Sequence, residues 1–130
     1  MQHILLVDDL KDALAMLQCA VQAAFGPLPC TLARSVREAL DVLERAGQDG
    51  TAFDLALVDL ALGDGSGLEV LDFMRAQPRL AEVPVLVVSA AADQDLLAEA
   101  RARGAQACLL KPVDLQQLRQ MALSLLGEVV

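Results

Sequence analysis

The chain is poor in the residue types that bind nucleic acids. Tryptophan and tyrosine are absent and only three phenylalanines occur, so stacking on bases or sugars is not expected. Ten basic residues stand against 18 acidic ones, and the net charge of −8 argues against a basic face for nucleic acid. No direct binding to nucleic acid is therefore predicted.

Cysteines are few, and long apolar runs are missing. Cys19, Cys30 and Cys108 are odd in number, widely spaced and set among apolar residues. This pattern favours small buried side chains in a reducing compartment over a disulfide framework or a zinc site. Apolar stretches stay shorter than the roughly 18 residues of a membrane span, and no signal-peptide pattern opens the chain. We therefore expect a cytoplasmic protein without membrane contact.

Four short apolar runs are present instead, and each ends on a polar residue suited to phosphoryl chemistry. Such runs are typical of strands buried on both faces of a parallel sheet. The carboxyl ends of parallel strands lie along one edge, where open α/β sheets bind their ligands. The polar residues are therefore predicted to meet in one site. The runs are 4–7, 55–58, 85–88 and 108–110, followed respectively by Asp8 and Asp9, by Asp59, by Ser89, and by Lys111 with Pro112.

Helical segments with start and stop signals separate these runs, and a weaker fifth strand is expected at 31–33. The resulting βαβαβαβαβα order predicts one α/β domain over residues 1–130, with right-handed crossovers. Five strands fit the doubly wound, flavodoxin-like order 2-1-3-4-5, in which the first and third strands are neighbours. The pairs Ser35–Glu38, Ser66–Glu69 and Asp114–Gln117 and the single Asp93 predict helix starts, whereas Gly26, Gly47, Pro78 and Gly104 predict helix ends.

In this fold Asp8, Asp9 and Asp59 come together at the ends of neighbouring strands. Three carboxylates repel one another, which raises at least one pKa or recruits a cation. Oxygen ligands with a high negative charge favour Mg²⁺ or Mn²⁺ over zinc. Carboxylates form aspartyl-phosphate intermediates, and a metal, a lysine and a hydroxyl would neutralise charge on the phosphoryl oxygens. The predicted chemistry is phosphoryl transfer.

Taken in order, the segments that carry these residues resemble the receiver domain of response regulators in two-component signalling. Each segment alone is a weak signal, but together and at these spacings they are a strong one. The resemblance covers essentially the whole chain. The matching segments are 5–9, 54–60, 65–71, 84–90, 104–105 and 110–112.

The resemblance implies a metal-binding phosphoacceptor site. Asp59 would accept the phosphoryl group from a phosphohistidine. Asp9 would bind the metal directly and Asp8 through water. The backbone carbonyl of Ala61 would complete the protein's share of the ligands.

The resemblance also implies how the phosphoryl group is sensed. Ser89 would hydrogen-bond one phosphoryl oxygen and Lys111 would pair with another, and the Lys111–Pro112 peptide bond is expected to be cis. Cys108 stands where a switching tyrosine or phenylalanine is common, so the aromatic half of the usual switch is missing. Gly63 replaces a usual proline, and a more mobile loop is expected there.

The implied partners are a sensor histidine kinase or a histidine phosphotransfer protein, which would meet the first helix. The fifth strand and the helices at 93–103 and 115–126 would form the output surface, which could also hold a homodimer. The chain would catalyse only its own phosphorylation and dephosphorylation. Ala61 and Ala91 are too small to shield the phosphoryl group or to assist an attacking water.

Two alternatives stay open. A pseudo-receiver would keep the fold and signal without phosphorylation, and Cys108 and Gly63 are the residues that favour it. A phosphatase similar to the haloacid dehalogenases would also use an aspartate nucleophile. That family has a DxD motif and a cap domain, however, whereas Asp8 and Asp9 are adjacent and no cap domain is evident. Taken singly, each polar residue at a strand end is also a common helix cap or turn residue.

Overall fold

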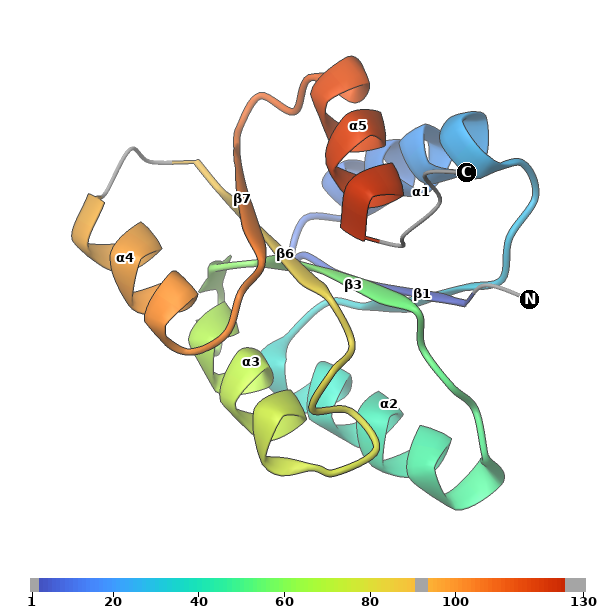
Figure 1. Cartoon of the computed structure of the whole chain (residues 1–130), viewed down its shortest axis with the longest axis vertical. Helices are drawn as coiled ribbons and strands as arrows, with labels where there is room; N and C mark the ends of the chain where they lie inside the picture. Colours follow the sequence, from blue (N-terminus) through green and yellow to red (C-terminus); the bar gives the residue numbers. More distant parts are fainter. Residues whose placement is uncertain (1–2, 91–93, 126–130) are drawn as a thin grey trace.

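The computed structural model describes residues 3–90 and 94–125, and it contains the predicted five-stranded parallel sheet. The strand order is β2-β1-β3-β6-β7, which is the doubly wound order expected from the sequence (Figure 1). Each neighbouring pair is parallel. The strands are β1 (Ile4–Val7), β2 (Cys30–Ala33), β3 (Leu55–Asp59), β6 (Val85–Ser89) and β7 (Ala107–Leu110).

In the part of the chain that the structure describes, five helices cover the two faces of the sheet. In Figure 1, α1 and α5 lie on one face, and α2, α3 and α4 lie on the other. The strands contribute alternate side chains to two separate cores, because successive residues of a strand point to opposite faces. Leu6 packs in the core under α1 and α5, whereas Leu5 and Val7 pack in the core under α2 and α3. The helices are α1 (Lys11–Phe25), α2 (Val36–Asp49), α3 (Gly67–Ala76), α4 (Gln94–Ala102) and α5 (Leu115–Leu125).

The predicted helix starts are present where the structure describes them. Ser66 and Glu69 form a complete capping box at α3. Ser35 caps α2 by accepting from the Glu38 N–H at 3.0 Å, although the Glu38 carboxylate accepts from the N–H of Arg34 instead of closing the box. In α5, the Asp114 carboxylate accepts from the N–H groups of residues 116 and 117. The expected cap Asp93 and the last expected α5 residue, Leu126, lie outside the described residues.

The prediction that α2 ends at Gly47 is wrong. The helix continues to Asp49, and Gly50 ends it in the left-handed conformation with a φ of +79°. A Cβ atom at Gly47 would collide with the guanidinium of Arg79, which lies against α2 and donates to the Leu43 carbonyl at 2.6 Å. Gly47 thus allows the Arg79 side chain to approach α2 closely, and it does not end the helix.

A short antiparallel hairpin follows β3 and was not predicted. Its strands are β4 (Ala61–Leu62) and β5 (Gly65–Ser66), and Ala61 pairs with Ser66. The hairpin connects β3 directly to α3. It therefore occupies the loop in which greater mobility was expected around Gly63.

The expectation of buried cysteines is wrong for Cys19, which is exposed on α1. This position lies on the outer side of the helix, between the buried residues Leu17 and Ala20. Cys30 and Cys108 are partly buried and pack against the two cores. Among the helices that the structure describes, none has the length and apolar character needed to cross a membrane.

Candidate functional site

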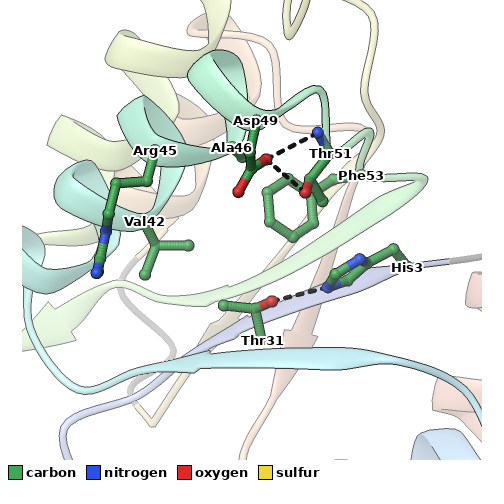
Figure 2. Close-up of a pocket in the computed structure, with 8 residues that line it drawn as sticks. All are labelled: His3, Thr31, Val42, Arg45, Ala46, Asp49, Thr51 and Phe53. Carbon is green, nitrogen blue, oxygen red and sulfur yellow. Dashed lines mark hydrogen bonds between the residues drawn. The ribbon is translucent and has the colours of Figure 1, made fainter.

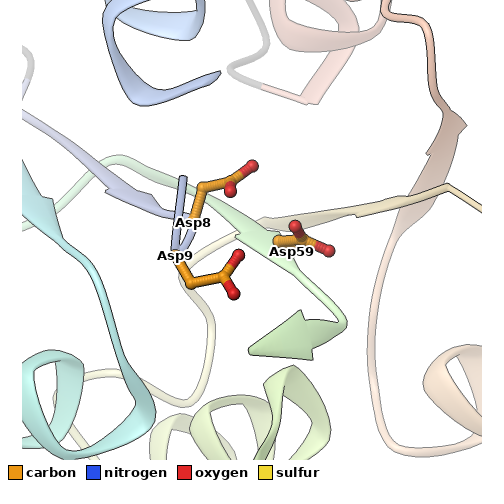
Figure 3. A group of neighbouring side chains, drawn as sticks. All are labelled: Asp8, Asp9 and Asp59. Atoms are coloured by element: carbon orange, nitrogen blue, oxygen red, sulfur yellow. The ribbon is translucent and has the colours of Figure 1, made fainter. Parts of the chain in front are cut away.

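Three carboxylates meet at the carboxyl ends of β1 and β3. The two strands are paired with Val7 opposite Val58, so Asp8 and Asp59 follow at equivalent places on neighbouring strands. Asp8, Asp9 and Asp59 each offer an oxygen, and these three oxygens lie within 4.8 Å of one another. Figure 3 shows the three side chains side by side at this edge of the sheet.

The cluster lies mostly below the surface. Asp8 is 0% exposed and Asp59 is 3% exposed, whereas Asp9 is half-buried. One oxygen of Asp8 accepts from the N–H of Leu10 at 2.9 Å, and one oxygen of Asp59 accepts from the N–H of Ala61 at 3.0 Å. Each of these two carboxylates keeps its second oxygen for another partner.

That partner is the ammonium of Lys111, which lies at the end of β7. Its Nζ donates to Asp59 Oδ2 at 2.8 Å and to Asp8 Oδ2 at 3.1 Å. One ammonium is therefore shared by two buried carboxylates. With Asp9 included, the four side chains carry a formal charge of −2 when all are ionised.

The environment shifts the pKa values of Asp59 and Lys111. Burial raises the pKa of Asp59 above the usual aspartate value, and the charge of Asp8 adds to this rise. Hydrogen bonds from Lys111 and from the Ala61 N–H oppose the rise without cancelling it. For Lys111, burial lowers the pKa, but hydrogen bonds and charge interactions with Asp59 and Asp8 outweigh burial, so the pKa is raised. Lys111 thus stays charged, but its single positive charge does not balance the negative charge of the three carboxylates when all are ionised.

The donor set fits a hard divalent cation. All three side chains offer oxygen, and neither histidine nor cysteine belongs to this cluster. Mg²⁺ and Mn²⁺ favour carboxylate, carbonyl and water oxygens, and an added cation would offset the remaining negative charge. Asp8, Asp9 and Asp59 are therefore the side chains that could hold such an ion.

Of the other predicted site residues, some adjoin this cluster and others do not. Ser89 is buried at the end of β6, and its carbonyl accepts from the Lys111 N–H at 2.8 Å. Ala61 is exposed at the start of β4, and the Lys111–Pro112 peptide bond is cis. Cys108 lies within β7 opposite Val87, away from the strand ends. Ala91 falls outside the described residues.

Asp64 is a residue whose role sequence reasoning missed. It lies between the two strands of the hairpin, and its carboxylate accepts from the N–H groups of Val36 at 2.8 Å and Arg37 at 3.1 Å. These groups begin α2, 28 residues earlier in the chain. The nearby Ser35 already provided a local cap, so nothing in the sequence indicated a distant second one.

A pocket of about 300 Å³ opens at the opposite end of the sheet, where the strands begin (Figure 2). His3 Nε2 lies 2.7 Å from Thr31 Oγ1, and the His3 ring meets Phe53 edge to face. The carboxylate of Asp49 accepts from both the N–H and the hydroxyl of Thr51. These polar groups pair with one another along the wall, so they do not converge on the pocket as a reactive centre would.

Comparison with known proteins agrees with the geometry of the strand-end site. The family model of the response regulator receiver domain matches residues 4–123. The chain is 36% identical over 120 residues to the response regulator protein PilR of Pseudomonas aeruginosa, covering 92% of this chain and 25% of PilR. It is 32% identical over 126 residues to the regulator of RpoS of Escherichia coli K12, covering 96% of this chain and 35% of that protein. The chain thus spans a quarter to a third of the length of these relatives.

Solved structures show the same fold. The phosphorylated cyanobacterial phytochrome response regulator RcpA superimposes with a TM-score of 0.78 at 29% identity, covering 93% of this chain and 88% of RcpA. The chemotaxis response regulator CheY4 of Vibrio cholerae superimposes with a TM-score of 0.83 at 25% identity, covering 96% of this chain and 98% of CheY4. The strand order, the carboxylate cluster and these matches lead to one conclusion. The chain belongs to the response regulator receiver domain family of two-component signalling.

Proposed function

We propose that Asp59 accepts a phosphoryl group from the phosphohistidine of a sensor histidine kinase or a histidine phosphotransfer protein. Mg²⁺ or Mn²⁺ would be held by Asp8, Asp9, Asp59 and the carbonyl of Ala61. One observation carries the proposal: a single ammonium is shared by two buried carboxylates beside a third carboxylate. In addition, RcpA, which is 29% identical, has been crystallised in phosphorylated form.

The residues divide the chemistry among them. A carboxylate oxygen of Asp59 would form a bond to phosphorus while the bond from phosphorus to the histidine nitrogen breaks. The electron pair of that bond stays on the nitrogen, and a phosphohistidine protonated on its other ring nitrogen leaves as neutral imidazole. The bound cation would supply positive charge near the phosphoryl oxygens. Lys111 already lies 2.8 Å from Asp59, so its ammonium needs only a short movement to reach an oxygen of the new group. The hydroxyl of Ser89 would bind another of these oxygens.

Phosphorylation would alter the interaction surface formed by α4, β7 and α5. Ser89 ends β6, which pairs directly with β7, and this pairing connects the site to that surface. Because Cys108 carries no ring, movement of Ser89 would transmit the change without an aromatic switch. We infer that residues 1–130 act as one receiver unit, and that the same surface would bind an output partner or a second copy. The three free thiols suit a reducing compartment such as the cytoplasm.

The direct test is the mass of the intact protein after incubation with acetyl phosphate and Mg²⁺. A gain of one phosphoryl group is expected, because the site supplies both the nucleophile and the compensating charge. Asp59→Asn should abolish this gain. Asp41→Asn, a change of equal charge at an exposed position on α2, should leave it intact.

A failure of this test would favour the pseudo-receiver, which Cys108 supports. In that case Mg²⁺ with beryllofluoride, which imitates the phosphoryl group, should also leave the melting temperature unchanged. A working site should instead melt at a higher temperature, because a ligand that binds only the folded state stabilises it. A phosphoryl gain that persists in Asp59→Asn would contradict the assignment of the acceptor.

A further inference from the structure

The hairpin after Asp59 lies directly beside the carboxylate cluster. Ala61, whose carbonyl is the proposed fourth metal ligand, begins its first strand. At the tip, a Cβ atom on Gly63 would lie 3.8 Å from Asp9 Oδ2, so the hairpin extends along the cluster. The position of this short segment therefore sets where the Ala61 backbone stands relative to the three carboxylates.

The base of the hairpin is held by its own neighbours. The N–H of Gly67 donates to the Leu60 carbonyl at 3.0 Å, and the capping box of Ser66 and Glu69 fixes the start of α3. The tip contains Gly63, which has no side chain to pack and which leaves the backbone more freedom than other residues would. Leu62 is buried in the core, but Gly63 and Asp64 are exposed at the tip, where a restraint must come from polar contacts.

Asp64 provides that restraint. Its two carboxylate oxygens accept separately from the N–H groups of Val36 and Arg37, which belong to the first turn of α2. These groups have no partner within the helix, and a carboxylate also complements the positive end of the helix dipole. Both hydrogen bonds lower the pKa of Asp64, so the carboxylate remains ionised and bound at neutral pH. The hairpin tip is thereby joined to a rigid helix.

We propose that Asp64 is a positioning residue for metal binding: by bridging the hairpin tip to the first turn of α2, it fixes the backbone at Ala61 beside the carboxylate cluster. This inference depends on the proposed function for its metal, but the bridge itself does not. Asp64 touches neither the cation nor the phosphoryl group in this role. It acts through the segment that it holds.

A comparison of three variants of the full chain tests the bridge. Asp64→Ala removes both hydrogen bonds, and Asp64→Asn keeps one amide oxygen as an acceptor. Ser35→Ala removes the other cap of α2, the hydrogen bond from the Glu38 N–H, without touching the hairpin. In the metal-free protein, Asp64→Ala should speed hydrogen–deuterium exchange in residues 61–66 and at the start of α2. Ser35→Ala should speed exchange only at the start of α2.

Mg²⁺ affinity, measured as the rise of melting temperature during a Mg²⁺ titration, tests the positioning role. Asp64→Ala should bind Mg²⁺ roughly tenfold more weakly, in the lower range for residues that orient metal ligands. Asp64→Asn should fall between Asp64→Ala and the unchanged protein. Ser35→Ala should bind Mg²⁺ with normal affinity, even if it lowers the melting temperature of the metal-free protein as much as Asp64→Ala does.

The outcomes separate this inference from the proposed function. Unchanged exchange in the hairpin of Asp64→Ala would overturn the bridge. Faster exchange with normal Mg²⁺ affinity would overturn the positioning role, and so would an equal loss of affinity in Ser35→Ala. If the unaltered protein showed no response to Mg²⁺, the proposed function would fail, while the exchange data would still report on the bridge.

Discussion

Lys111 places one ammonium between the carboxylates of Asp8 and Asp59, and this arrangement decides how the site responds to single substitutions. Removing one member of a buried ion pair is usually destabilising, because the other charge is left without a partner. Here Lys111 still has Asp8 as an ion-pair partner when the charge of Asp59 is removed. The usual penalty is therefore absent, and the repulsion between the two carboxylates is relieved.

Asp59→Asn should consequently stabilise the metal-free protein at neutral pH, by on the order of 1 kcal/mol. The folded protein raises the pKa of Asp59, so it holds the proton more tightly than the unfolded chain does. Ionisation of Asp59 therefore costs stability as the pH rises from the usual aspartate pKa through the raised value, and the full cost remains above it. Urea unfolding with a metal chelator, at neutral and acid pH, measures the difference.

The gain should shrink in acid, where Asp59 is protonated and already uncharged. Asp41→Asn, which removes an exposed charge on α2, is the matched control and should change stability little. A neutral-pH loss of stability in Asp59→Asn would show that the hydrogen bond to Lys111 outweighs the repulsion.

Among the helices and strands, α2 shows how far the sequence could predict local structure. Its start was predictable, because Ser35 and Glu38 lie in a pattern that acts locally. Its end was not, because the contact that explains Gly47 comes from Arg79, 32 residues later. Local signals therefore predicted where the strands and most helices begin. They did not predict that Gly47 lies within α2, because its contact is with a side chain distant in the sequence.

A double-mutant cycle on Gly47 and Arg79 tests this contact. Gly47→Ala alone should change stability little, because the gain in helix propensity is offset when Arg79 is displaced from the Leu43 carbonyl. In an Arg79→Ala background, the same substitution should stabilise α2 by about 1 kcal/mol, the usual difference between glycine and alanine within a helix. Thermal unfolding of the four proteins gives the coupling energy.

Equal effects of Gly47→Ala in both backgrounds would show that Arg79 adapts without loss. Gly50 offers a comparison of the opposite kind, since its φ of +79° disfavours alanine whatever the background. Gly50→Ala should be destabilising with or without Arg79.

Over the whole molecule, the net charge of −8 means that any salt can stabilise the fold by screening repulsion. A specific metal effect must therefore be separated from this general one. We expect MgCl₂ to raise the melting temperature more than NaCl at matched ionic strength. At a hundredfold excess over its dissociation constant, Mg²⁺ should add about 2.7 kcal/mol to the free energy of unfolding.

Asp9→Asn should abolish the extra effect of Mg²⁺ and retain the response to NaCl, because it removes the half-buried member of the carboxylate cluster, a proposed metal ligand. Asp41→Asn again provides a control of equal charge, and it should keep both responses. An extra Mg²⁺ effect that survives in Asp9→Asn would place the ion elsewhere on the acidic surface.

The fold and the membership of the strand-end cluster were largely predictable, for a topological reason. A βα alternation with short buried strands leaves few arrangements, and all of them gather the carboxyl ends of the strands. The strand pattern alone thus predicts that Asp8, Asp59 and Lys111 lie together, as they do in the structure. The hairpin and the bridge of Asp64 to α2 were not, because they depend on a contact between surface segments that no periodic pattern reports.

The pocket in Figure 2 lies where the strands begin. The carboxylate cluster lies at the opposite, carboxyl ends of the strands. The paired groups of the pocket, such as Asp49 with Thr51, fasten the turn that leads from α2 toward β3. The paired groups at this end of the sheet stabilise the fold, whereas the proposed phosphoacceptor site lies at the other end. Substitutions around the pocket should therefore change the stability of the fold and leave the arrangement of the carboxylate cluster as it is.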